Sequence, residues 1–291
     1  MRRLLPGLFL LGFAVLAAAA TILDDRGHTV VMARPANRIV ALAPHLAEIV
    51  FAAGAGAHLV GISAATRYPD EARRLPLVSS NGRVDAERIV SLKADLALAW
   101  MSGNARLDFE RLENLGIPVV ATEVRSLPDI ARLIRMVGAL AGTRAAAEQS
   151  AQRTERMLAE LEYRYAGARP ISVFVEVWPQ PLITVSGGHL ISDVLRVCGG
   201  TNVFRASPVL TPRVSPESLL AARPEVILAN AAGGEDVHRW RKYSALAAVR
   251  EGRIHSIDPD VLHGQGPHLL EGVREVCSSL EQARREIGAG R

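Results

Sequence analysis

One segment of the chain occurs twice with the same order of residue types. Residues 84–100 begin Val-Asp-Ala-Glu-Arg-Ile-Val and end in the apolar run Leu-Ala-Leu-Ala-Trp, and residues 214–230 begin Val-Ser-Pro-Glu-Ser-Leu-Leu and end in Val-Ile-Leu-Ala-Asn. The two copies align without a gap. In each copy a helix-capping residue type, Asp85 or Ser215, opens a short helical pattern that leads into a buried strand. The repeat therefore predicts two lobes of similar structure.

Strand-like and helix-like segments alternate along the rest of the chain. We expect strands over residues 38–43, 58–62, 96–100, 119–122, 171–176 and 225–229, and helices over residues 46–53, 104–115, 127–140 and 189–197. Strands separated by helices favour a mainly parallel sheet that is covered on both faces.

The longest helical pattern contains neither Gly nor Pro over residues 144–166. Thr143 is of a type that caps helices, and Gly167 is of a type that ends them. A helix of roughly 23 residues is about 35 Å long, which is long enough to join two lobes. The predicted fold class is α/β, with two similar α/β lobes, mainly parallel sheets and one long connecting α-helix. We expect four segments: a signal peptide at 1–20, an N-terminal lobe at 21–143, the helix at 144–168 and a C-terminal lobe at 169–291.

The N-terminus has the pattern of an export signal. Arg2 and Arg3 precede an apolar run over residues 4–16, and the small residues 18–20 supply a cleavage site. The alternative is a membrane anchor, but the apolar run is shorter than the roughly 20 residues that span a bilayer. We expect residues 1–20 to be removed and the mature chain to be exported.

The two cysteines, Cys198 and Cys277, both lie in the exported part of the chain. An oxidising compartment favours a disulfide between an isolated pair. The alternative is two buried free thiols.

The charge balance and the motifs exclude several function classes. The 34 basic residues are spread against 30 acidic ones without a basic cluster, so no nucleic-acid partner is expected. The chain has no Gly-x-Ser-x-Gly elbow, no His-Glu-x-x-His helix and no Gly-rich phosphate loop. Ser186-Gly-Gly-His189 is the nearest resemblance to a hydrolase motif, and its glycines suit a turn better. We expect a binding protein and no catalytic residue, with an exported hydrolase as the alternative.

Ligands of open parallel sheets bind beyond the carboxyl ends of the strands. If two lobes face each other, these ends surround one cleft. A Trp at such an end offers a large flat surface to a bulky ligand, although ordinary core packing is the alternative. The residues expected at these ends are Pro44, His45, Trp100, Trp178, Pro179 and Asn230.

Four histidines, at positions 45, 189, 263 and 268, lie near predicted loops or helix starts. The Gly and Pro residues between positions 263 and 268 prevent the one-face helical geometry of a metal-binding pair. We expect polar structural roles and no metal site. His45 is the exception, since it follows the first predicted strand and is placed for an axial contact to a metal in the ligand.

Four segments of the chain resemble the periplasmic cobalamin-binding proteins of ATP-binding-cassette (ABC) importers: residues 38–44, 84–100, 195–204 and 214–229. These proteins belong to a larger helical-backbone group that also serves iron-siderophores and haem. The most distinctive stretch is Cys-Gly-Gly-Thr-Asn-Val-Phe at 198–204. The resemblance implies a periplasmic protein with two α/β lobes, a connecting helix that resists closure, and a disulfide between the two cysteines.

The resemblance also implies a partner. Glu87 and Glu217 match a pair of surface glutamates, one per lobe, that engage arginines on the two subunits of a permease. A pseudo-symmetric protein suits a two-fold partner. The alternative is that each Glu only complements the dipole of its helix, which contributes about 0.3 to 1 kcal/mol.

The residues expected in the cleft indicate which ligand the protein carries. Trp100 matches an aromatic residue of the family that lies against the ligand. Other family aromatics are replaced here, and the replacing residues are Ala65, Asn81 and Thr211. Asn81 remains an expected ligand contact, and Trp178 with Pro179 offers new surface. We expect a monomer without a cofactor that captures cobalamin or a related corrinoid for an inner-membrane ABC permease dimer, with haem or an iron-siderophore as the alternative ligand.

Overall fold

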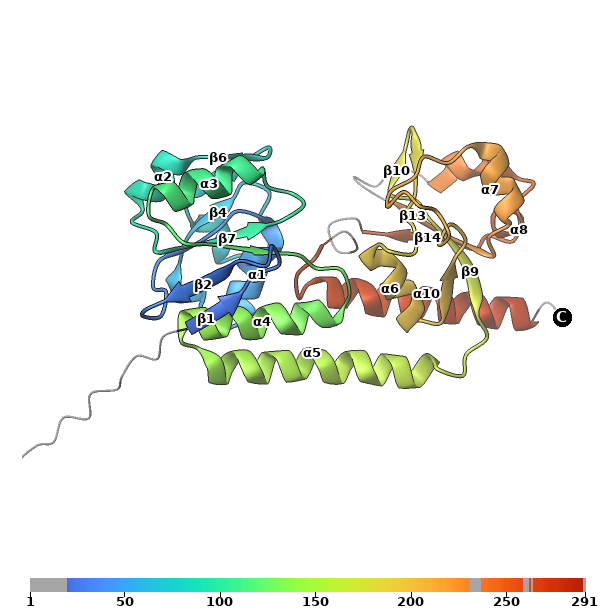
Figure 1. Cartoon of the computed structure of the whole chain (residues 1–291). Coiled ribbons are helices and arrows are strands. Elements are labelled where there is room, and N and C mark those ends of the chain that lie inside the picture. The colour runs from blue at the N-terminus through green and yellow to red at the C-terminus, as the bar shows by residue number, and fades with distance from the viewer. Residues whose placement is uncertain (1–19, 231–236, 259–261, 263, 290–291) are drawn as a thin grey trace, which may run out of the picture.

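The computed structural model describes residues 20–230, 237–258, 262 and 264–289. Two α/β lobes lie next to each other, and the long helix α5 (Arg144–Tyr165) runs beneath both (Figure 1). The predicted signal peptide lies outside the described residues except for Ala20, which opens the first strand. Within the described ranges, no helix combines the length and the apolar character that a membrane span requires.

The N-terminal lobe is built on a six-stranded sheet in the order β6-β5-β4-β3-β7-β8. Neighbouring strands are parallel except for β5 and the edge strand β6, which are antiparallel. The strands are β3 (Ile39–Ala41), β4 (Leu59–Ser63), β5 (Leu77–Ser80), β6 (Arg83–Val84), β7 (Leu96–Trp100) and β8 (Val119–Thr122). The other elements are the hairpin β1 (Ala20–Leu23) and β2 (Thr29–Met32), helices α1 (Pro44–Ala52), α2 (Ala86–Ser91), α3 (Arg106–Asn114) and α4 (Pro128–Ala141), and the 3-10 turns Gly56–His58 and Ala72–Arg74.

The C-terminal lobe has a four-stranded parallel sheet in the order β12-β9-β13-β14. Its strands are β9 (Ile171–Val175), β12 (Gly200–Asn202), β13 (Val226–Asn230) and β14 (Ile254–Ile257). The short hairpin β10 (Trp178–Pro179) and β11 (Leu182–Ile183) projects from it. The helices are α6 (Leu190–Val197), α7 (Pro216–Ala222), α8 (Ala247–Arg250), α10 (Leu269–Ala289) and the 3-10 helix η4 (Val237–Tyr243).

The two sheets share one topology. In each lobe the first strand of the sheet, β3 or β9, lies inside it, and the chain builds outward on one side before it crosses to the other. The order reverses between β3 and β7 and again between β9 and β13. The strands that the repeat predicted, β7 and β13, therefore hold equivalent places. This confirms the predicted fold class, and open sheets of this kind commonly bind ligands beside such reversals.

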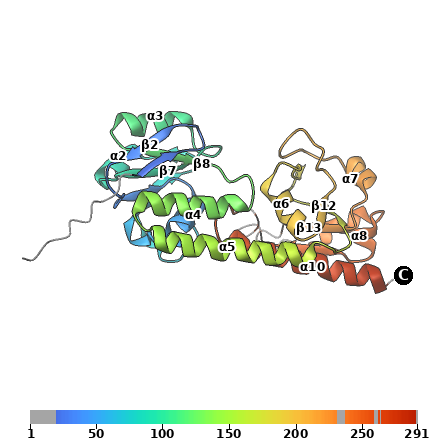
Figure 2. The same cartoon turned by 60° about the horizontal axis from the view of Figure 1, so that its bottom comes forward.

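Helix α5 packs along its whole length. Its first half lies against α4, where Gly138 approaches so closely that a Cβ on it would lie 2.2 Å from the Cβ of Ala147. Arg135 of α4 forms ion pairs with Glu148 and Glu155 of α5. The other end of α5 reaches the C-terminal lobe, where the Tyr165 hydroxyl hydrogen-bonds a carboxylate of α10. Figure 2 shows the helix spanning both lobes from a second direction.

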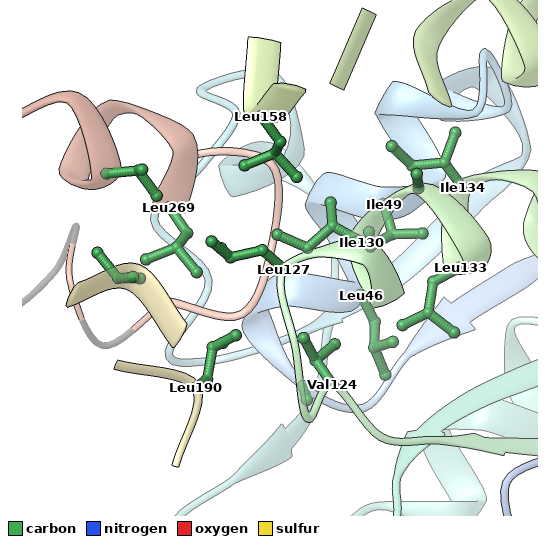
Figure 3. Packing of buried hydrophobic residues seen from close by; sticks show 14 of the residues in the cluster. Leu46, Ile49, Val124, Leu127, Ile130, Leu133, Ile134, Leu158, Leu190 and Leu269 are labelled. Carbon is green, nitrogen blue, oxygen red and sulfur yellow. The ribbon is translucent and has the colours of Figure 1, made fainter. Parts of the chain in front are cut away.

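A single apolar cluster continues from one lobe into the other. Leu127, at the start of α4, points toward Leu269 of α10 (Figure 3). Leu158 of α5 and Leu190 of α6 lie on either side of this pair. Hinge opening at this point would expose buried apolar surface at about 25 cal/mol per Å². A backbone hydrogen bond from the Leu127 N–H to Asp193 Oδ2, 2.9 Å long, joins the same elements.

Cys198, at the end of α6, forms a disulfide with Cys277 of α10 across a sequence separation of 79 residues. The predicted disulfide is therefore confirmed, and the free-thiol alternative is wrong. Closing such a loop constrains the unfolded chain by about 4.5 kcal/mol on the chain-entropy model. The bond secures α10, a helix that the sequence analysis did not predict.

Two local predictions need correction. Thr143 does not cap α5 with its side chain, because its hydroxyl donates to the carbonyl oxygen of Ala53 at 2.7 Å. The first helix begins at Pro44 and not at residue 46 as predicted, so Pro44 and His45 lie in the first turn of α1. Proline suits that position, since its missing N–H would have no partner in the helix anyway.

Candidate ligand-binding cleft

A cleft of about 600 Å³ lies between the lobes, beside the sheet reversals of both. The N-terminal lobe contributes the end of β7 and residues that follow β7 and β8, and the C-terminal lobe contributes the start of α6 and three further segments, at Val177, at Leu210 and at residues 262, 264 and 265. The lining includes Trp100, Met101, Glu123, Arg125, Val177, His189, Leu190, Leu210 and Gln265. Apolar surface dominates, with a few polar groups among it, as is typical of small-molecule sites.

Trp100 is the most firmly held of the cleft residues. Its Nε1 donates to Glu123 Oε1 at 3.1 Å, and its backbone N–H donates to Asn104 Oδ1 at 2.8 Å. Gly103 lies under the ring, since a Cβ there would stand 1.8 Å from Trp100 Cε3. The indole is therefore fixed before any ligand arrives, which lowers the entropic cost of binding. The sequence analysis missed Glu123, because an acid after a strand has no distinguishing pattern.

His45 does not line the cleft, but it touches a residue that does. Its ring meets Trp100 edge to face, with 5.6 Å between the centroids. Burial lowers the pKa of His45 to about 3, so the imidazole is neutral at ordinary pH. Its Nε2 is buried and has no hydrogen-bond partner among the described residues. A neutral imidazole with an unused nitrogen is chemically able to accept a hydrogen bond or to bind a metal.

Trp178 and Pro179 form strand β10 on the far side of the cleft. The Trp178 side chain is 55% exposed, and its Nε1 donates to the carbonyl oxygen of Gln180. The preceding residue, Val177, is the one that lines the cleft. Asn230 supports it, because Asn230 Nδ2 donates to the Val177 carbonyl oxygen at 2.7 Å. Asn230 thus positions the cleft wall at the reversal between β9 and β13.

Asn81 lies apart from this cleft. It occupies the turn between β5 and β6 with a φ of 49°, and it lines a separate hollow together with Glu87 and Arg111. A left-handed φ is tolerated by Asn better than by most residues. The turn gives a structural reason for an Asn at this position.

The segment at residues 186–189, the nearest resemblance to a hydrolase motif, leads into α6. The Nδ1 of His189 accepts the backbone N–H of Ile191 at 3.2 Å and so caps α6. The neighbouring Ser186 is buried, and its carbonyl oxygen accepts the hydroxyl of Ser192. Both residues of the suspected motif therefore build the turn into α6.

Glu87 and Glu217 lie in the first turns of α2 and α7, and both are exposed. The helices begin as predicted, because Asp85 accepts the Arg88 N–H and Ser215 accepts the Ser218 N–H. In Figure 1, α2 and α7 lie on the side of the molecule opposite α5. Hydrogen bonds from its own backbone N–H and from Ser215 lower the pKa of Glu217, so its carboxylate is ionised.

A second surface feature accompanies Glu87. Helices α2 and α3 enclose an open groove of about 790 Å³. Its apolar side chains are exposed: Val90 by 47%, Leu107 by 76% and Leu115 by 52%. Contiguous exposed apolar surface of this kind marks an interaction site more often than chance.

Comparison with known proteins supports one family. The model of the family described as periplasmic binding protein matches residues 39–261. The chain is 34% identical over 253 residues to a vitamin B12-binding protein of Vibrio cholerae serotype O1, covering 87% of this chain and 92% of that protein. It is 32% identical over 253 residues to a vitamin B12-binding protein of Pectobacterium atrosepticum, covering 85% and 90%.

Solved structures agree with these relatives. The periplasmic vitamin B12-binding protein BtuF of Vibrio cholerae superposes with a TM-score of 0.79 at 33% identity, over 86% of this chain and 98% of that chain. The periplasmic haem-binding protein RhuT from Roseiflexus sp. RS-1 gives a TM-score of 0.76 at 25% identity, over 85% and 99%. The predicted resemblance is confirmed, and the chain belongs to the periplasmic binding protein family.

Proposed function

We propose that this protein captures cobalamin or a related corrinoid in the periplasm and delivers it to the permease of an ABC importer. The observation that carries the proposal is the fixed indole of Trp100 at the interlobe cleft, in a chain that is similar to a vitamin B12-binding protein over 87% of its length. Binding without chemistry is supported by the relatives, which are binding proteins, and by His189, whose Nδ1 accepts the Ile191 N–H in the turn into α6.

The cleft offers the contacts that a corrinoid requires. A flat macrocycle buries a large apolar face, and the Trp100 ring with Leu190 and Leu210 supplies apolar surface from both lobes. Polar groups at the edge of a corrinoid are amides, which pair with neutral donors and acceptors such as Gln265. Trp178 and Pro179 extend the apolar surface beyond the cleft when a large ligand protrudes.

Delivery of the ligand to the permease uses the first turns of α2 and α7, on the side of the molecule opposite α5 (Figure 1). Glu87 and Glu217 present one carboxylate from each lobe, and a permease dimer presents the same basic group twice. The exposed groove beside Glu87 adds apolar contact area at the same docking face. Little lobe closure accompanies capture, since the apolar cluster around Leu127 is continuous between the lobes.

Haem is the second candidate ligand, and one observation favours it. His45 is neutral, and its Nε2 has no hydrogen-bond partner among the described residues. A neutral imidazole with a free nitrogen is the chemistry that binds a haem iron. An absorbance titration separates the two ligands. Mature protein without residues 1–20 is titrated with cobalamin, cobinamide, haem and a ferric siderophore. The proposal expects tight corrinoid binding, and tight haem or siderophore binding without any corrinoid binding would overturn it.

A further inference from the structure

A carboxylate of the N-terminal lobe holds a loop of the C-terminal lobe. Glu48 lies in α1, and its Oε2 accepts the backbone N–H of His268 at 2.9 Å. Gly266 packs directly against it, because a Cβ there would lie 2.4 Å from Glu48 Oε2 and 3.0 Å from Glu48 Cβ. Only glycine leaves this space, so the loop backbone and the carboxylate fit each other closely.

The loop at residues 264–268 has a second contact with the N-terminal lobe. The ring of Tyr68, in the loop after β4, stacks on the His268 ring with 3.8 Å between the centroids. His268 immediately precedes Leu269, the first residue of α10. At the other end of the loop, Gly264 and Gln265 line the cleft. The segment from 264 to 268 therefore connects a cleft wall to two contacts with the opposite lobe.

We infer that Glu48 is a positioning residue for the ligand cleft: it fixes the segment 264–268 as a wall of the site from the opposite lobe, without touching the ligand. Its effect on affinity rests on the proposed function, whereas its hold on the segment does not. Because the contact bridges the lobes, losing it frees the cleft wall while each lobe keeps its own core.

Charge around the contact makes it sensitive to protons. Burial raises the pKa of Glu48 to about 7, against the hydrogen bond from the His268 N–H, which lowers it, while repulsion from Glu271 of α10 adds to the rise. His268 and Tyr68 face the carboxyl from the loops, and His45 shares its helix. Opening of the segment that lets water reach the carboxyl removes the burial and lowers the pKa of Glu48. The closed contact therefore binds more protons, and it is favoured below about pH 7 and weakened as pH rises through 7.

Hydrogen exchange of the ligand-free protein tests the hold directly. The peptide 264–270 is followed by mass spectrometry at pH 6 and pH 8 in wild type, Glu48→Gln and Glu48→Ala, with Glu71→Gln as the matched control at an exposed acid. Glutamine keeps the acceptor and cannot ionise. We expect wild-type protection, corrected for intrinsic rates, to fall between pH 6 and pH 8 and to stay constant in Glu48→Gln. Glu48→Ala should lose about tenfold at both pH values. Equal protection in all variants would overturn the inference.

Ligand titration gives the second readout. At pH 6, cobalamin affinity should fall about tenfold in Glu48→Ala and should be restored in Glu48→Gln. Gly266→Ala should weaken it similarly, because the added methyl group displaces the carboxylate. If Glu48→Gln is as weak as Glu48→Ala, the accepting oxygen is not what positions the wall, and the inference is wrong. If wild type binds no corrinoid, the proposed function fails, while the exchange result still decides the role of Glu48.

Discussion

His45 and Trp100 meet edge to face at the point where the strand order of the N-terminal sheet reverses, with 5.6 Å between their ring centroids. His45 is buried, whereas Trp100 is half-buried and lines the cleft. The contact ties the position of the cleft indole to the first turn of α1, and so to the same helix that carries Glu48.

Replacing Trp100 should cost more affinity than any other single change in the cleft. We expect Trp100→Ala to weaken cobalamin binding by about 30-fold or more, since a fixed, desolvated aromatic is typical of a binding hot spot. Trp178→Ala should have a smaller effect, because that side chain is 55% exposed. Fluorescence or absorbance titration measures both. A larger loss from Trp178→Ala would mean that the ligand sits mainly on the β10 hairpin.

Acid should destabilise the protein through His45. Its pKa is lowered to about 3 in the fold, below the unfolded value of 6.5, so stability is complete above 6.5 and is lost as pH falls toward 3. This residue alone should cost about 2 kcal/mol between pH 7 and pH 5. Thermal unfolding of wild type and His45→Asn across this range tests the assignment. An unchanged pH dependence in the variant would show that His45 is not the group responsible.

The disulfide should stabilise the protein without shaping the cleft. Cys198→Ser with Cys277→Ser should lower the free energy of unfolding by about 2 to 5 kcal/mol. Because Cys198 follows the last residue of α6, whereas the first residues of that helix line the cleft, ligand affinity should change less than twofold in protein that remains folded. Denaturant unfolding and ligand titration of the same sample separate the two quantities.

The repeat and the helical periodicity predicted most of the fold because they record local requirements. Asp85 and Ser215 start equivalent helices. The helix over residues 144–165 could be predicted from its own residue types, since this segment contains neither Gly nor Pro. Helix α10 was missed although Val273, Val276 and Leu280 face the core at helical spacing. Its charged residues and its internal glycine hid the pattern.

The candidate site was only partly predictable for a different reason. Trp100 was found because tryptophan at a strand end is rare, and its position at the cleft follows from the parallel sheet. Glu123 and Glu48 act on partners far along the chain, and their importance exists only once the chain has folded. Nothing in the sequence around Glu48 separates it from a glutamate on an exposed helix face.

The proposal that Glu87 and Glu217 dock the permease can be tested by reversing both charges. Charge reversal of both, Glu87→Arg with Glu217→Arg, should abolish ligand uptake through the importer and leave cobalamin binding by the purified protein unchanged. The matched control reverses two other exposed acids, Glu71→Arg with Glu286→Arg, and should transport normally. Transport by the double Glu87 and Glu217 variant would rule out docking through these carboxylates.

If Glu87 and Glu217 dock the permease as proposed, they should not contribute equally. Glu217 is pre-oriented by hydrogen bonds from Ser215 and from its own backbone, whereas the only cap of α2 is Asp85, which serves the Arg88 N–H. A pre-oriented carboxylate loses less freedom on binding. We therefore expect Ser215→Ala to weaken association with the permease about two- to fivefold in a pull-down or surface-binding assay, without affecting the ligand. Full affinity in Ser215→Ala would mean that Glu217 gains nothing from its cap and that both carboxylates dock as flexible groups.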